Sequence, residues 1–61
     1  MPQTQSYVIE VEDEAVGLVV PENDGVTFHA VHPRTVPLEG RRFADEAEAR
    51  SAARHALRRA A

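Results

Sequence analysis

The chain has 61 residues, no cysteine and a formal net charge of −3 at pH 7. A chain of this length buries only about 60% of the surface that it exposes when unfolded, and without cysteine it forms neither disulfides nor thiolate metal sites. No apolar run approaches the roughly 20 residues that span a bilayer, and no signal peptide is recognisable, which predicts a soluble, cytoplasmic protein without membrane contacts.

The two halves of the chain differ in charge. Residues 1–33 contain six acidic residues and neither Lys nor Arg, whereas residues 34–61 contain seven Arg and four acidic residues. Such a division favours two layers of one domain that attract each other over a basic tail for nucleic acid. We expect a single domain over residues 6–61. A disordered tail is expected over residues 1–5, which are polar and show no periodicity.

Two strands are predicted in the first third of the chain. Residues 6–12 and residues 15–20 carry apolar side chains at every second position, as half-buried strands do. Asp13 and Glu14 would form a two-residue turn between them. In the register that follows, one face gathers the large apolar side chains. These are Tyr7, Ile9, Val11, Val16, Leu18 and Val20.

A turn and a third strand come next. Asn23, Asp24 and Gly25 tolerate left-handed backbone angles, so a three-residue loop is expected there. The strand that follows should cover residues 26–32. On its core face it carries Val26, Phe28 and Ala30.

The segment between this strand and the C-terminal helix is the least regular. Pro33 and Pro37 cannot donate to a ladder, which restricts a fourth strand within residues 34–43 to a short edge piece and leaves its existence open. Leu38 and Phe43 are the only bulky apolar residues after Pro37 in this segment, so both are expected to point into the core.

The C-terminal segment predicts one amphipathic helix. Asp45 is a good N-cap, and Glu48 completes an approximate capping box, so the helix should begin near Glu46. Alanines recur at the three-and-four spacing of a single helical face. Leu57 is the only large apolar residue on that face, and we expect it to be the buried anchor.

Together these elements predict an α+β fold, in which a three-stranded antiparallel β-meander, with a fourth strand left open, is covered on one face by a single C-terminal helix. The uncovered face would present a column of valines among polar side chains. One interpretation is a solvated face, because scattered exposed valines are common. The other is contact with a second copy or another protein, because the core is small. The interface residues predicted on this basis are Val8, Val19, Val31, His29 and Thr27.

No motif carries catalytic or metal chemistry. His29 and His32 are three residues apart on a predicted strand and should point to opposite faces, so they do not form a shared metal site. Ser6 and Ser51 have no recognisable base, and the three glycines are not spaced as in a phosphate-binding loop. We therefore expect no enzymatic activity and neither a metal nor a cofactor.

Residues 40–52 combine an aromatic residue, a helix cap and periodic alanines. They resemble the last turn and helix of the plant-type AP2 domain, and of small uncharacterised bacterial domains with a β-meander and an alanine-rich helix. The resemblance implies three strands followed by a helix and, in AP2-like domains, DNA recognition through Arg and Trp on the exposed sheet face. The corresponding face here carries Glu10 and Glu12 instead. The arginines able to attract phosphate lie in the helical layer and are Arg41, Arg42, Arg50, Arg54 and Arg58.

Two functions stand as hypotheses. The first is a small non-catalytic protein-interaction module that forms a homodimer, or binds another protein, through the uncovered sheet face or a strand edge. The alternative is an accessory nucleic-acid-binding domain that uses the five arginines of the helical layer. The pattern of residues does not select the partner.

Overall fold

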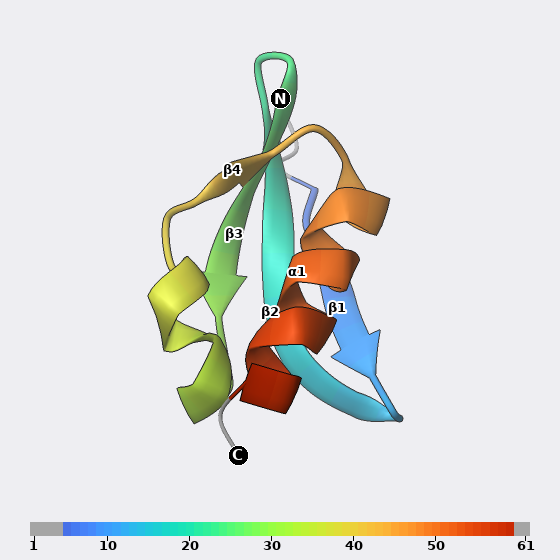
Figure 1. The fold of residues 1–61 in the computed structure, drawn as a ribbon. Helices are drawn as coiled ribbons and strands as arrows, with labels where there is room; N and C mark the ends of the chain where they lie inside the picture. Colours follow the sequence, from blue (N-terminus) through green and yellow to red (C-terminus); the bar gives the residue numbers. More distant parts are fainter. Residues whose placement is uncertain (1–4, 60–61) are drawn as a thin grey trace.

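The computed structural model describes residues 5–59 and shows a four-stranded antiparallel sheet with one helix packed against it (Figure 1). The strands follow the order β1 (Tyr7–Val11), β2 (Glu14–Glu22), β3 (Gly25–Ala30) and β4 (Arg42–Phe43). A 3₁₀-helix, η1 (Pro33–Leu38), connects β3 to β4, and the α-helix α1 (Glu46–Arg59) follows. The predicted α+β class is confirmed, and the strand that the sequence left open is β4.

The β1–β2 hairpin turns one residue earlier than predicted. Its two turn residues are Glu12 and Asp13, with φ angles of 55° and 66°, and Val11 pairs with Glu14. Two left-handed residues in succession are the requirement of the tight turn whose twist matches that of the flanking strands. Asp13 and Glu14, the predicted turn, would have moved Glu14 out of β2. The predicted turn is therefore wrong by one residue.

A bulge then changes which face each residue of β2 occupies. Glu10 pairs with Ala15 and Ile9 pairs with Gly17, so Val16 is the additional residue on β2. One extra residue reverses the alternation beyond it. Val19 is consequently fully buried, and the prediction that placed it on the uncovered face is wrong. Leu18 and Val20, predicted for the core, are only half-buried and lie on the opposite face.

The second hairpin extends beyond β1. Glu22 pairs with Gly25, so the turn is the pair Asn23 and Asp24, one residue shorter than predicted. Pro21 lies inside β2 at this end of the sheet. The β1–β2 ladder ends where Tyr7 pairs with Val19. The nitrogen of Pro21, which has no hydrogen to donate, therefore faces no strand in the described part of the chain.

The core lies between α1 and the inner face of the sheet, and its centre is Phe28. This side chain is fully buried, and its ring makes an edge-to-face contact with Phe43 at a centroid distance of 6.3 Å. The ring also covers Gly17, where a Cβ atom would lie 2.1 Å from its Cζ atom. Ile9, Val16 and Val19 complete the fully buried apolar side chains of the sheet. Ile9, Val16 and Phe28 were predicted for the core, whereas Val19 was not.

Tyr7, also predicted for the core, is 43% exposed. It pairs with Val19 and is the first residue of an edge strand. Its hydroxyl donates to Gln5 Oε1 over 2.9 Å, which keeps the polar end of the ring at the surface. The remainder of the tail predicted over residues 1–5 lies outside the described residues.

The helix begins where its cap predicts. Asp45 Oδ1 accepts a hydrogen bond from the Glu48 N–H over 2.9 Å, while the Glu48 carboxylate accepts from the Ala44 N–H rather than from Asp45. In the capping box, the side chain of Glu48 therefore bonds to the backbone N–H of the residue before the N-cap instead of to that of the N-cap itself. Ala49 and Ala53 are fully buried against the sheet, whereas Leu57 is half-buried at the margin. The prediction of Leu57 as the buried anchor is wrong, because the small alanines let the middle of α1 approach closely and make the central contact.

The segment that the prolines bracket forms η1 instead of an edge strand. His32 caps it, since His32 Nδ1 accepts from the Arg34 N–H over 3.0 Å. Thr35 is fully buried, and its hydroxyl lies 2.7 Å from the Val16 carbonyl oxygen and 3.0 Å from that of His32. This anchors η1 to the bulge of β2. Leu38 points into the core, as predicted.

Glu39 replaces a missing strand at the end of β3. β4 pairs with only two residues of β3, and the Ala30 N–H donates instead to Glu39 Oε1 over 2.7 Å. Glu39 Oε2 lies 3.0 Å from His29 Nδ1. The hydrogen bond from the Ala30 backbone, followed by that from His29, lowers the pKa of Glu39.

This lowered pKa predicts that the stability of the fold falls at acidic pH, as Glu39 becomes protonated. Because the folded pKa lies below the unfolded one, ionised Glu39 stabilises the fold above the unfolded pKa of about 4.3, and the contribution disappears as the pH falls through the folded pKa. Thermal unfolding of the protein and of Glu39→Gln, followed by circular dichroism, should show a lower melting temperature for the variant at about pH 5. The difference should close towards about pH 3.

The matched control is Glu10→Gln, because Glu10 is exposed on β1 and accepts no side-chain hydrogen bond from residues 5–59. If the difference in melting temperature between Glu39→Gln and the unsubstituted protein is the same at about pH 5 and at about pH 3, Glu39 has no such role.

Candidate functional site

The face of the sheet that α1 leaves uncovered contains a row of side chains from three strands. Val8 pairs with Leu18, and Leu18 pairs with His29. Val20 and Thr27 form the next row towards the β2–β3 turn. Val8 is 54% exposed, and the other four are half-buried. We call these five residues the outer face.

Three of the predicted interface residues belong to the outer face, namely Val8, Thr27 and His29. Val31 is equally exposed at 54% but lies after the end of β3, and Val19 is in the core. Sequence reasoning missed Leu18 and Val20, because the bulge that turns them outward leaves no mark on the pattern of apolar residues.

The polar members of the outer face already have partners. Thr27 Oγ1 donates to Glu22 Oε1 over 2.8 Å, and His29 is bonded to Glu39. Arg42 lies beside Thr27 in the adjacent strand and donates to the Glu22 carbonyl oxygen over 3.0 Å. The groups without an assigned contact on this face are therefore apolar, and they are concentrated towards β1.

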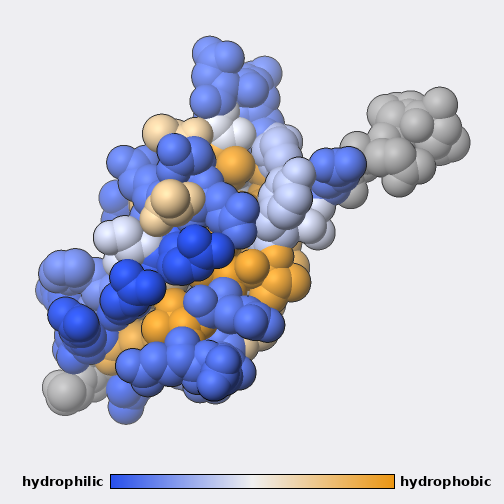
Figure 2. Space-filling view, turned by 90° about the vertical axis from the view of Figure 1, so that its right-hand side faces the viewer, coloured by the Kyte–Doolittle hydropathy of each residue, from blue (hydrophilic) through white to orange (hydrophobic). Residues whose placement is uncertain are grey.

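The edge of the sheet at β1 is open. Within residues 5–59, β1 is hydrogen-bonded to β2 alone, so the outward N–H and C=O groups of Tyr7–Val11 have no strand beside them. Folded proteins usually protect such edges with charged side chains, especially Lys, with Pro or with a covering segment; β1 contains neither Lys nor Pro, and Glu10 is its one charged residue. Figure 2 faces this side of the molecule and shows apolar surface exposed between hydrophilic side chains.

The histidines near the outer face have separate partners. His29 Nδ1 is bonded to Glu39, whereas His32 Nε2 lies 3.5 Å from Glu14 Oε2. The predicted strand over residues 26–32 ends earlier, at Ala30, and His32 caps η1, so the turn into η1 separates the two imidazoles rather than the alternation along one strand. Over residues 5–59, no group of three or more His, Cys, Asp or Glu side chains is placed to hold a metal ion.

The five arginines predicted to contact nucleic acid do not share one surface. Arg42 is on the strand beside the outer face, and Arg50 forms an ion pair with Glu46 at 3.0 Å. Arg54 and Arg58 line a depression that also contains acidic side chains, those of Glu12 and Glu14. Of these five, only Arg41 lines the groove beside η1, which shares Arg34 with the depression. The sequence showed that arginines are abundant in this half, but not how they are divided.

No family model matches the chain, and no curated protein or solved structure matches it. The resemblance of residues 40–52 to AP2-like and small bacterial domains thus rests on those residues alone. No helix among residues 5–59 is long and apolar enough to cross a membrane.

Proposed function

We propose that the protein is a small non-catalytic interaction module that pairs with a second copy of itself through the edge of β1. The observation that carries this proposal is the open edge of β1 within residues 5–59, which adjoins the exposed side chain of Val8. Adding a strand to an open edge provides main-chain hydrogen bonds, and the neighbouring side chains supply the specificity. A twofold axis beside β1 would join two sheets into one.

The side chains of β1 favour one register for this pairing. In an antiparallel pair of identical strands, the residue at the twofold axis meets its own copy, and the side chains of each pair lie on the same face. Centring on Val8 brings two exposed valines together on the outer face. Centring on Glu10 would place two carboxylates opposite each other, which is destabilising. We therefore place the axis at Val8.

Such pairing also compensates for the small core. A chain of 61 residues has little apolar surface to bury by itself. In a dimer, Val8 would pack beside its copy and lose part of its solvent contact, whereas Leu18 lies one strand further from the partner. Because Leu18 is already half-buried, Val8 is expected to contribute the larger gain.

The test is the molar mass in solution, measured by size-exclusion chromatography with light scattering over a range of concentrations. We expect the protein to dimerise and Val8→Glu to raise the dissociation constant at least about tenfold, because it puts like charges at the axis. Val31→Glu is the matched control, since Val31 has the same exposure as Val8 but lies away from β1.

Circular dichroism of each variant should show that the fold is kept. A monomeric protein at the highest concentration would contradict the homodimer. Equal weakening by Val8→Glu and Val31→Glu would mean that the interface lies elsewhere.

The alternative of a nucleic-acid-binding domain has less support from the geometry. Its five arginines are divided among the sheet, an ion pair, a depression of mixed charge and a groove, whereas phosphate binding requires positive charge gathered on the docking surface. Titration with mixed-sequence DNA and RNA at low salt tests it, because such contacts are strongest there.

A further inference from the structure

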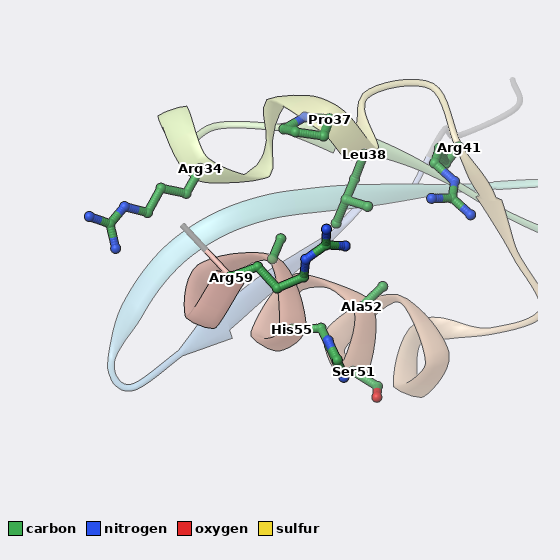
Figure 3. A pocket seen from close by; sticks show the side chains of 9 residues that line it. Arg34, Pro37, Leu38, Arg41, Ser51, Ala52, His55 and Arg59 are labelled. Carbon is green, nitrogen blue, oxygen red and sulfur yellow. The ribbon is translucent and has the colours of Figure 1, made fainter. Parts of the chain in front are cut away.

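A groove with a volume of about 590 Å³ lies between η1 and the second half of α1 (Figure 3). Its floor is apolar and is formed by Pro37 and Leu38 of η1 and by Ala52 and Ala56 of α1. Figure 1 shows η1 on one side of α1 and β1 on the other, so the groove is separate from the open edge of the sheet. A volume of this size falls within the range of ligand-binding clefts.

The rim of this groove is cationic. Arg34, Arg41 and Arg59 line it together with His55, and no acidic residue does. In Figure 3, Arg59 extends from α1 towards η1, Arg41 lies at one end, and Arg34 points outward at the other. These residues come from three segments of the chain, so their proximity is a product of the fold.

No carboxylate among residues 5–59 forms an ion pair with any of these three arginines. Over residues 5–59, the only ion pair between an arginine and a carboxylate joins Arg50 to Glu46. The guanidinium of Arg41 instead lies 5.8 Å from the centroid of the Phe43 ring, which orients it without neutralising it. Like charges held around one concave surface raise the local concentration of anions. The groove is thus suited to an anionic ligand.

We propose that the groove binds a short acidic peptide segment of a partner protein, with an aliphatic side chain on the floor and carboxylates at Arg41 and Arg59. Guanidinium groups pair with carboxylates through two parallel hydrogen bonds, and the floor of Leu38, Ala52 and Ala56 provides apolar contact. This site goes beyond the proposed dimer, since neither uses a residue of the other.

Two observations favour a peptide over a nucleic acid. No Phe, Tyr or Trp lines the groove, although aromatic platforms are what single strands stack on. A longer polyanion would also run past the groove onto a chain whose net charge is −3. A short acidic segment avoids both problems.

The chain offers two matched pairs of variants for the test. Arg41 and Arg59 line the groove, whereas the adjacent Arg42 and Arg58 do not, so charge reversal within each pair changes the net charge equally. The probe is a fluorescein-labelled peptide of alternating Leu and Glu, and its anisotropy is measured at low and at moderate salt. We expect Arg41→Glu and Arg59→Glu to raise the dissociation constant at least about tenfold, and Arg42→Glu and Arg58→Glu less than about threefold.

Further measurements decide the outcome. A peptide of alternating Leu and Gln should bind at least about tenfold more weakly, and Val8→Glu should bind the acidic peptide as the unsubstituted protein does. If a charge-reversed variant loses the circular dichroism spectrum of the folded protein, Arg41→Gln or Arg59→Gln replaces it.

The proposal is overturned by absence of peptide binding at low salt or by equal effects within the matched pairs. Tighter binding of mixed-sequence DNA, weakened by the same two groove variants, would also overturn it and identify a nucleic-acid site.

Discussion

Replacing Phe28 with alanine is expected to remove much or all of the stability of the fold. Phe28 is fully buried, packs edge-to-face on Phe43 and covers Gly17. Truncating a buried phenylalanine costs about 3–5 kcal/mol, because apolar contacts are lost and a cavity remains. A domain of 61 residues has a total stability of about 3–9 kcal/mol, so this one change removes much or all of it.

Urea denaturation and thermal melting, followed by circular dichroism, measure this effect. We expect the melting temperature to fall by at least about 12 °C if a transition is still visible. Tyr7→Ala is the control, since Tyr7 is also an aromatic residue of the sheet but is 43% exposed, and its loss should cost less than about 1 kcal/mol. Similar shifts for the two variants would show that Phe28 is not the centre of the core.

Gly17→Ala is expected to destabilise the protein by about 1–3 kcal/mol or more. A Cβ atom at this position would lie 2.1, 2.6 and 2.9 Å from three atoms of the Phe28 ring, so the ring would have to move inside a packed core. The φ angle of Gly17 is not in the left-handed region, and alanine adopts such a backbone without strain. Where space is available, Gly→Ala stabilises by about 0.4–1 kcal/mol. The sign of the change therefore reports the contact directly.

A double-mutant cycle separates this contact from other effects. Phe28→Leu shortens the side chain that covers Gly17 and should accommodate the new methyl group. We expect Gly17→Ala to cost about 0.5–3 kcal/mol less in the Phe28→Leu background than in the unsubstituted protein, as determined by urea denaturation. Additive costs, or a Gly17→Ala variant more stable than its parent, would contradict the placement of the ring.

The elements with strong local signals were predicted well. The Asp45 cap placed the start of α1 correctly, and the core face of β3 follows from Val26 and Phe28 at alternate positions. In both cases neighbours along the chain carry the information. The helix cap and the strand period act over a few residues, so the fold around them has little influence.

The second strand shows where this reasoning fails. Residues 15–20 are apolar at five of six positions, with only Gly17 interrupting, so alternation alone does not set the face. The turn at Glu12 and Asp13 and the bulge at Val16 decided it, and the bulge is held from outside by the hydroxyl of Thr35. A contact across 19 residues of sequence is invisible to a local pattern.

The candidate sites divide in the same way. Val8, Thr27 and His29 were predicted for the uncovered face and lie there, while Val19 was misplaced by the bulge. For the groove, the abundance of arginine was a signal, but Arg34 and Arg59 were not selected because they are far apart in the sequence.

By itself, the sequence determined the α+β class, the meander, the position of α1 and the division of charge between the two halves. These follow from interactions within a few residues or from composition. Only the tertiary structure decided which face Val19 occupies, that Phe28 packs on Gly17, and that Arg41 and Arg59 border one groove. These depend on long-range packing, in which a single extra residue in β2 reverses the faces of those that follow.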